Sequence, residues 1–412
     1  MITSSSFTRN TSERVASPTQ YARHKIRRRG MSSLIAALAC ATGVALAAGF
    51  TETDLVANKA SLTDANGVVH SPAHVDANLV NPWGVGTSQT GPFWVADADS
   101  GLSTLYDSSG TPRSLVVSIP APGDPLGAGG APTGLVFNIA ATLPPAAPVF
   151  PISGFDPTGA PITASATFLF ATEDGTIVGW NANVSPSSAG FTPPSRHAII
   201  AVDNSGSGAI YKGLAITNAG GTPLLYATNF HAGTVDVFAG SFGTPSGLPA
   251  AAFTDPKLPS GYAPFNIVPV GSRLFVTYAV QDEDAEDDVA GQGHGIVDTF
   301  SFTGQMLARF AQHGQLNSPW GIAVAPASFG AFAGDILIGN FGDGHINVFD
   351  PTTGELLDKL RTPHGQAIVI DGLWTLRVGS GNANGGDSSK VYFSAGPNDE
   401  SDGLFGNLAP SP

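Results

Sequence analysis

Short apolar runs alternate with polar, glycine-containing turns along most of the chain. The run FWVAD at 93–97 leads through a turn to STLY at 103–106, and LLYATN at 224–229 leads to VDVFA at 235–239. A third pair is ILIGN at 336–340 with INVF at 346–349. Runs of this length, bounded by Gly, Asn and Asp, predict short strands joined as hairpins rather than helices. We therefore expect an all-β chain.

The hairpins belong to an internal repeat. Residues 81–85, NPWGV, recur as SPWGI at 318–322, and each copy precedes two further strands. The opening strands are marked by Gly134, Gly213, Asn266, Gly321 and Gly372, at similar intervals once the Pro/Ala-rich insertion 140–164 is set aside. Units of about 50 residues with about four antiparallel strands cannot bury both faces alone and pack radially as propeller blades. The repeat predicts a six-bladed β-propeller.

The two ends of the chain are predicted to close this ring. The last unit ends with an apolar run at 404–408 and has no obvious fourth strand. The apolar residues 55–57, near the start of the repeats, can supply that strand from the N-terminal side. We expect one propeller domain over residues 48–412, with insertions at 140–164 and 281–295 that form exposed loops.

The repeat also carries a family resemblance. NPWGVG with FWVADADSGLSTLYDSSG, and SPWGIAV with ILIGNFGDGHINVFDPTTG, resemble blades of NHL type. Together they resemble an uncharacterised family of secreted bacterial six-bladed propellers, over roughly residues 52–410. The paired Pro-Trp-Gly openings and the acidic insert after Tyr278 are the most specific features. NHL-like propellers include binding modules, interaction modules, lyases and lactonases, so the resemblance implies a fold rather than one activity.

Composition and charge narrow the class of partner. The 412 residues include 51 Gly and 32 Pro, only 12% are charged, and the formal net charge is −14. The N-terminal residues 1–47 hold seven of the 18 Lys and Arg, so the remainder is more acidic still. Such a body repels phosphate, which excludes nucleic acids and anionic membrane surfaces as partners.

The N-terminal residues 1–47 read as a secretory signal. Basic residues at 23–29 precede an apolar stretch at 34–48, and Ala-Leu-Ala at 45–47 offers a cleavage site. We expect a cleaved signal and a secreted, periplasmic or cell-envelope protein without stable membrane insertion. An N-terminal membrane anchor is the alternative. Cys40 is the only cysteine, so the mature chain has no disulfide and no cysteine nucleophile.

Propeller topology brings polar loop residues to one face. If each first strand lines the channel, residues that precede first strands and residues that follow second strands converge at the channel mouth. Oxygen ligands there suit a hard cation such as calcium. The candidate ligands are Asp97, Glu173, Asn229 and Asn340. Asp and Asn are also ordinary turn residues that bond the local backbone, which is the competing interpretation.

Two further groups carry candidate chemistry. The segment 282–288, DEDAEDD, offers Asp282, Asp284, Asp287 and Asp288 as ligands for a second calcium ion, or forms a solvated loop that covers the mouth. His231 and His364 are candidate proton-transfer groups. No Gly-x-Ser-x-Gly motif marks a serine nucleophile. Trp83, Trp320 and Phe265, which recur at equivalent points, are expected to pack between blades.

These observations favour a binding or interaction module, with calcium as its candidate ion and a protein, glycan or small molecule as its partner. The alternative is a metal-dependent hydrolase or lactonase with a cation at the channel mouth. A structural envelope or matrix protein is the third possibility.

Overall fold

In the computed structural model, the described residues are 49–142, 147–219 and 221–411. They all belong to one compact unit, formed by residues 46–412. The predicted signal peptide, its alternative as an anchor and Cys40 lie outside the described residues. Within those residues, no helix is long and apolar enough to cross a membrane.

Strands form six antiparallel sheets, one for each blade, as the repeat predicts. Blade 1 contains β5 (Pro82–Thr87), β6 (Phe93–Asp97), β7 (Leu102–Tyr106) and β8 (Val117–Ser118). Blade 2 contains β9 (Pro132–Phe137), β12 (Phe168–Thr172), β13 (Thr176–Trp180) and β14 (Ile199–Asp203). Blade 3 contains β15 (Tyr211–Ala219), β16 (Thr222–Asn229) and β17 (Thr234–Ala239).

The later blades follow the same order. Blade 4 contains β18 (Tyr262–Val270), β19 (Arg273–Val280), β20 (Ile296–Phe300) and β21 (Met306–Gln312). Blade 5 contains β22 (Pro319–Val324), β23 (Ile336–Asn340), β24 (Ile346–Phe349) and β25 (Leu356–Lys359). Blade 6 contains β26 (Leu373–Val378), β27 (Val391–Ala395), β28 (Leu404–Pro410) and β1 (Phe50–Ala57).

Smaller elements connect and decorate the blades. They are β2 (Leu62–Thr63), β3 (Val69–His70), β4 (His74–Val75), β10 (Pro151–Phe155), β11 (Pro161–Ser165), η1 (Ile139–Thr142), η2 (Ser205–Ser207) and η3 (Ala327–Phe332). Blade 3 has three strands where four are expected. The segment after β17 contains Pro245 and Pro249, and proline cannot donate to a strand ladder.

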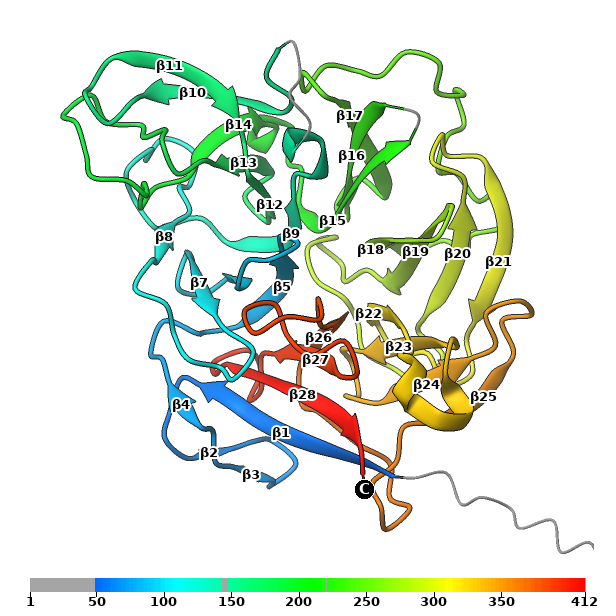
Figure 1. The fold of residues 1–412 in the computed structure, drawn as a ribbon. Helices are drawn as coiled ribbons and strands as arrows, with labels where there is room; N and C mark the ends of the chain where they lie inside the picture. Colours follow the sequence, from blue (N-terminus) through cyan, green and yellow to red (C-terminus); the bar gives the residue numbers. More distant parts are fainter. Residues whose placement is uncertain (1–48, 143–146, 220, 412) are drawn as a thin grey trace, which may run out of the picture. The chain divides into compact units, whose positions relative to one another are not determined.

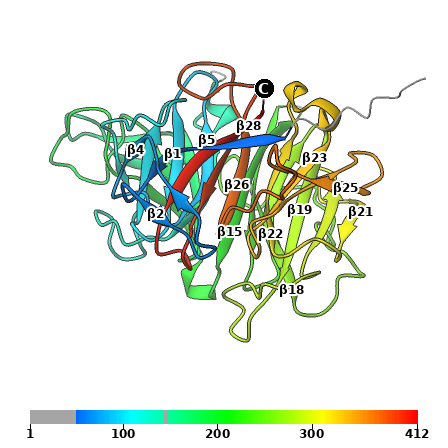
Figure 2. The same cartoon turned by 90° about the horizontal axis from the view of Figure 1, so that it is seen from below.

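The first strands of the six blades surround one central channel. Contacts run in a closed circle through β5, β9, β15, β18, β22 and β26 and return to β5 (Figure 1). Ring closure follows the prediction, because β1 pairs with β28 from Phe50 opposite Pro410 to Ala57 opposite Leu404 (Figure 2). The N-terminal side thus contributes eight residues to the last blade's sheet, in a strand longer than the apolar triplet 55–57 suggests. β4 adds a short parallel fifth strand.

The repeated glycines have a steric reason. A Cβ on Gly134 would lie 2.4 Å from the backbone nitrogen of Leu214, in the first strand of the next blade. A Cβ on Gly321 would lie 2.6 Å from the backbone oxygen of Trp374. Neighbouring first strands therefore approach so closely at the channel that a side chain has no room there. This approach explains why Gly marks the start of most repeats.

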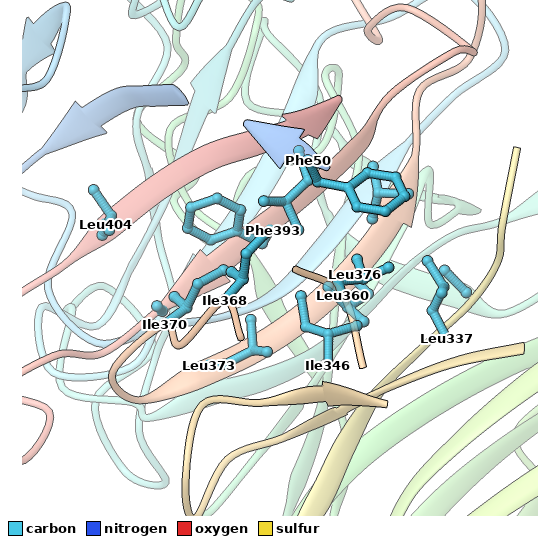
Figure 3. Packing of buried hydrophobic residues seen from close by; sticks show 14 of the residues in the cluster. Phe50, Leu337, Ile346, Leu360, Ile368, Ile370, Leu373, Leu376, Phe393 and Leu404 are labelled. Carbon is cyan, nitrogen blue, oxygen red and sulfur yellow. The ribbon is translucent and has the colours of Figure 1, made fainter. Parts of the chain in front are cut away.

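Blades 5 and 6 pack through a large apolar cluster that includes the closing strand. Phe50 of β1 is 3% exposed, and its ring centre lies 4.8 Å from that of Phe329 in η3. Figure 3 shows Phe50 above Phe393 and the leucine and isoleucine side chains of the neighbouring strands. Because β1 contributes to this cluster, ring closure buries apolar surface as well as pairing backbone groups.

The insertions differ from exposed loops. Within 140–164, β10 and β11 form an antiparallel hairpin, and Phe150 and Ile152 at its start are buried. The expectation of a wholly exposed loop there is wrong, because these apolar side chains pack on blades 2 and 3. The acidic insert 281–295 folds back on itself through an antiparallel bridge between Gln281 and Asp288.

Candidate functional site

All six first strands run in the same direction, so the channel has two chemically different ends. We call the end where these strands begin the mouth and the end where they finish the base. Aromatic side chains near the strand starts gather at the mouth side, and a cavity lies at the base side.

Aromatic rings fill the channel just inside the mouth. Trp83 stacks on Trp374 with ring centres 3.5 Å apart and meets Trp320 edge-on at 6.1 Å. Phe265 lies 6.5 Å from Trp83, also edge-on. These rings come from β5, β18, β22 and β26, and all are buried. The prediction that the recurring aromatic residues pack between blades is confirmed, and their common position is the channel centre.

Lys212 lies at the middle of the mouth. Its side chain is 2% exposed and bonds the carboxylates of Glu173 and Asp287, with Asp287 Oδ1 3.1 Å from Nζ. The ammonium also lies 5.2 Å from the centre of the Trp83 ring. Burial alone would lower the pKa of Lys212, but Glu173 and Asp287 raise it above its usual value. Lys212 therefore stays charged.

A second polar group lies beside Lys212. Asn81 donates from Nδ2 to Glu400 Oε2 at 2.6 Å and to Asp99 Oδ1 at 3.1 Å, and it accepts from Trp374 Nε1 at 3.0 Å. Burial, with the nearby charge of Glu173, raises the pKa of Glu400 to about 7. Sequence reasoning missed Lys212 and Glu400. The sequence signal that could have revealed Lys212 is a lysine inside the otherwise apolar run 211–216.

Three of the four residues predicted to hold a cation at the mouth bond within their own blades. Asp97 Oδ2 accepts from the Thr104 backbone at 2.9 Å. Asn229 Nδ2 donates to Asp236 at 3.2 Å, and Asn340 Nδ2 donates to Asp343 at 2.9 Å. Such local contacts are expected if these Asp and Asn residues stabilise turns and strand ends, which is the competing interpretation of the sequence.

Glu173 is the fourth of these residues, and it is the one that reaches the channel. Its partner is Lys212 rather than the other three predicted ligands. The structure therefore does not bring the four side chains to a common partner. Calcium binding at the mouth stays a prediction.

The acidic insert contributes one residue to this network. Asp287 reaches Lys212, while Asp282 Oδ1 accepts from the Glu286 backbone N–H at 2.9 Å within the insert. Asp284 is exposed, and burial raises the pKa of Asp288 to about 6. Through the contact between Asp287 and Lys212, the insert covers part of the mouth. Calcium binding by the acidic residues of the insert stays a prediction.

The two histidines lie in different places. His231 is exposed in the turn between β16 and β17. His364 is exposed between β25 and β26 and lines a hollow with Gly49, Phe50 and Phe332, beside the closing strand. The structure does not join them as a proton-transfer pair.

The base of the channel holds a cavity of about 390 Å³. Its wall is formed by residues of all six first strands, and most are apolar. The lining residues are Gly84, Val85, Gly134, Leu135, Val136, Leu214, Asn266, Ile267, Val268, Pro269, Val270, Gly271, Trp320, Gly321, Ile322, Ala323, Val324, Thr375, Leu376, Arg377 and Val378. Arg377 is the one charged residue among them. No sequence motif indicated this cavity.

Arg377 is half-buried at the end of β26. Its Nη2 donates to Thr87 Oγ1 at 2.9 Å, and its Nη1 lies 3.5 Å from the Val85 carbonyl oxygen. Within the part of the chain that the structure describes, no carboxylate pairs with this guanidinium. Burial lowers the pKa of Arg377 to about 10, which leaves it charged at neutral pH. The same side chain also lines a neighbouring hollow with Thr87, Phe137 and Ser380.

Two other polar side chains of the cavity wall, Asn266 and Thr375, are already bonded. Asn266 Nδ2 donates to the Trp320 backbone oxygen at 2.7 Å, and Asn266 Oδ1 accepts from the Ile267 backbone. Thr375 Oγ1 donates to the Trp83 backbone oxygen at 2.7 Å. The cavity therefore combines lining residues that are mostly of apolar type with one cation that lacks an acidic partner.

Comparison with known proteins finds relatives in a giant virus. The chain is 31% identical over 342 residues to the uncharacterised protein L690 of Acanthamoeba polyphaga mimivirus, covering 82% of each chain. It is 29% identical over 340 residues to the uncharacterised protein R648 of the same virus, covering 82% of this chain and 76% of that one. No protein-family model matches the chain. A bacterial source and secretion stay predictions.

Solved structures with a related arrangement include two enzymes. A glucose dehydrogenase aligns with a TM-score of 0.45 at 12% identity, covering 81% of this chain and 98% of that one. Virginiamycin B lyase from Staphylococcus aureus aligns with a TM-score of 0.42 at 9% identity, covering 87% of this chain and 99% of the lyase.

Proposed function

Because this chain belongs to the family of the mimivirus protein L690, whose name states no activity, its own residues have to indicate its role, and we propose that it is a ligand-binding propeller. Its ligand is a small organic anion that has a carboxylate on an apolar body. The binding site is the cavity at the base of the channel, with Arg377 as the anchor for the carboxylate.

Arg377 is the observation that carries this proposal. A guanidinium in an apolar wall is costly to bury without a counter-charge, and a planar carboxylate matches its paired N–H donors. The cavity of about 390 Å³ is within the size range of small-molecule sites, which are mostly apolar with a few polar anchors. An apolar body would lie against side chains such as Leu135, Ile267 and Ile322.

The mouth is a less suitable ligand-binding site than the base of the channel. Stacked rings fill the channel there, and Lys212 is already paired with two carboxylates. The alternative function is a metal-dependent hydrolase or lactonase. It finds little support in the predicted cation ligands, because Asp97 Oδ2, Asn229 Nδ2 and Asn340 Nδ2 form hydrogen bonds inside their own blades. Secretion of this binding module, with a cleaved signal at residues 1–47, is part of the same proposal.

Calorimetric titration with a matched pair of probes tests the proposal. Phenylacetate and 2-phenylethanol have the same apolar body and differ in charge. We expect phenylacetate to bind more tightly, by roughly 10- to 100-fold, because hydrogen bonds to charged groups contribute about 1.5–3 kcal/mol. Arg377→Met should remove this difference.

The matched control is Arg196→Met, which changes an exposed arginine in the loop between β13 and β14. It should leave both affinities unchanged. Equal affinity of the two probes for the unaltered protein, or a preference for phenylacetate that survives Arg377→Met, would refute Arg377 as the carboxylate anchor.

A further inference from the structure

A histidine and two carboxylates converge away from the channel, on the closing strand of the ring. His70 Nδ1 lies 3.2 Å from Asp54 Oδ1 and 3.9 Å from Glu52 Oε1. One ligand atom from each of the three side chains lies within 4.8 Å of the other two. Among the described residues, no other group of His, Cys, Asp or Glu meets this criterion.

Strand geometry explains why these side chains meet. Glu52 and Asp54 are two residues apart in β1, so their side chains leave the strand on the same face. His70 belongs to β3, which pairs with β2 so that Leu62 lies opposite His70. Leu62 is 2% exposed and packs in the same apolar cluster as Phe50. This packing holds the β2–β3 hairpin, and with it His70, against the closing strand.

A fourth side chain orients the imidazole. Asp64 Oδ2 lies 3.6 Å from His70 Nε2, on the side of the ring away from Glu52 and Asp54. The Asp64 carboxylate is fixed by a hydrogen bond of 2.7 Å from the Val68 backbone to Oδ1. A carboxylate on this side favours the tautomer with the proton on Nε2, in which Nδ1 can bind a metal. Nδ1 is then the nitrogen that faces Glu52 and Asp54.

Two oxygen atoms in this group lack a partner. Asp64 is 5% exposed, and its Oδ2 is buried without a hydrogen bond. Glu52 Oε1 is also buried without one. Three carboxylates around one imidazole thus leave excess negative charge and unsatisfied oxygens at a half-buried place, which a bound cation would correct.

We propose that Glu52, Asp54 and His70 bind one divalent transition-metal ion of the zinc class, with Asp64 as the residue that orients His70. An imidazole nitrogen with two carboxylate oxygens is a donor set that zinc accepts, whereas calcium takes oxygen ligands. Three protein ligands leave a fourth position for water. The ion joins the β2–β3 hairpin to β1 and so stabilises the strand that closes the ring.

Metal analysis and calorimetry on the full chain test this site. After chelation and dialysis, zinc titration of the unaltered protein should show one tight site, and the melting temperature should rise with zinc and fall again on chelation. Calcium at the same concentration should produce neither effect. Absence of zinc binding, or calcium binding in its place at this site, would overturn the proposal.

Conservative variants locate the ion. Glu52→Gln and Asp54→Asn each remove one anionic ligand with little change of shape, and each should weaken zinc binding by at least 10-fold. Asp64→Asn should weaken it by roughly 10- to 100-fold through the imidazole, as losses of outer partners do. Circular dichroism in chelator checks that each variant folds.

Asp284→Asn, in the exposed acidic insert, is the matched control and should leave zinc affinity unchanged. If Asp284→Asn weakens zinc binding while Glu52→Gln and Asp54→Asn do not, the ion binds at the insert and the proposed site is wrong.

Discussion

The ammonium of Lys212 and the carboxylate of Asp287, 3.1 Å apart, join the first strand of blade 3 to the acidic insert of blade 4. Glu173 of blade 2 accepts from the same ammonium, so one lysine links three neighbouring blades at the channel mouth. The insert is thereby held against the mouth, although seven of its 15 residues are exposed.

Removing this lysine should destabilise the propeller. Lys212→Met leaves Glu173 and Asp287 without a counter-charge, and we expect a loss of about 2–3 kcal/mol, below the 3–5 typical of fully buried pairs because Asp287 is largely exposed. Urea denaturation measures the change. Lys257→Met, at an exposed lysine, is the control. A loss below about 0.5 kcal/mol, the size of an ordinary surface change, would show that the network is not stabilising.

Glu400 should make stability fall as the pH rises. Its pKa is raised from an ordinary 4.5 to about 7 in the folded protein, so the folded state retains a proton that the unfolded chain releases between these values. The stability that protonated Glu400 provides is complete below about pH 4.5 and is lost by about pH 7. Glu400→Gln keeps an acceptor for Asn81 and cannot ionise.

Thermal unfolding across this pH range tests the effect. Glu400→Gln and the unaltered protein should have similar stability at pH 4.5, and the variant should become the more stable of the two as the pH approaches 7. Asp399→Asn, at the exposed neighbour, should show no such divergence. Parallel curves for Glu400→Gln and the unaltered protein would contradict the raised pKa.

Filling the cavity should block ligand binding without touching Arg377. Val268 lines the cavity and is half-buried, so Val268→Trp places a large ring in the space that the apolar body would take. We expect phenylacetate binding to fall at least 10-fold. Leu307→Trp, at a position 47% exposed on β21, is the control for the added ring. Unchanged affinity in Val268→Trp would place the probe outside this cavity.

The closing strand should contribute strongly to stability. Phe50→Ala removes a side chain that is 3% exposed and packs on Phe329, and changes of this kind cost about 3–5 kcal/mol. Leu356→Ala, at a position 39% exposed in blade 5, should cost less than about 1 kcal/mol. Guanidinium denaturation compares them. Similar losses in both variants would mean that β1 closes the ring through backbone pairing alone.

The fold was readable from the sequence because its signals are local and repeated. The alternation of short apolar runs with Gly, Asn and Asp turns specifies strands, and the recurrence of Pro-Trp-Gly at 82–84 and 319–321 specifies the repeat. The sequence also predicted that the N-terminal strand closes the ring, because the last repeat has no obvious fourth strand of its own. The convergence of Glu173 and the acidic insert at the mouth followed from the direction of the strands.

The sites were decided by tertiary structure, because each depends on contacts between residues far apart in the chain. Asp97, Asn229 and Asn340 have the residue types of cation ligands, yet Asp97 Oδ2 and the two amide nitrogens form hydrogen bonds inside their own blades. Arg377 becomes unusual only when the six blades place it beside mostly apolar residues without a carboxylate partner. Glu52, Asp54 and His70 meet only because Leu62 packs its hairpin onto the closing strand. Composition and repeat length determined the architecture, whereas the direction and burial of individual side chains determined which residues can bind.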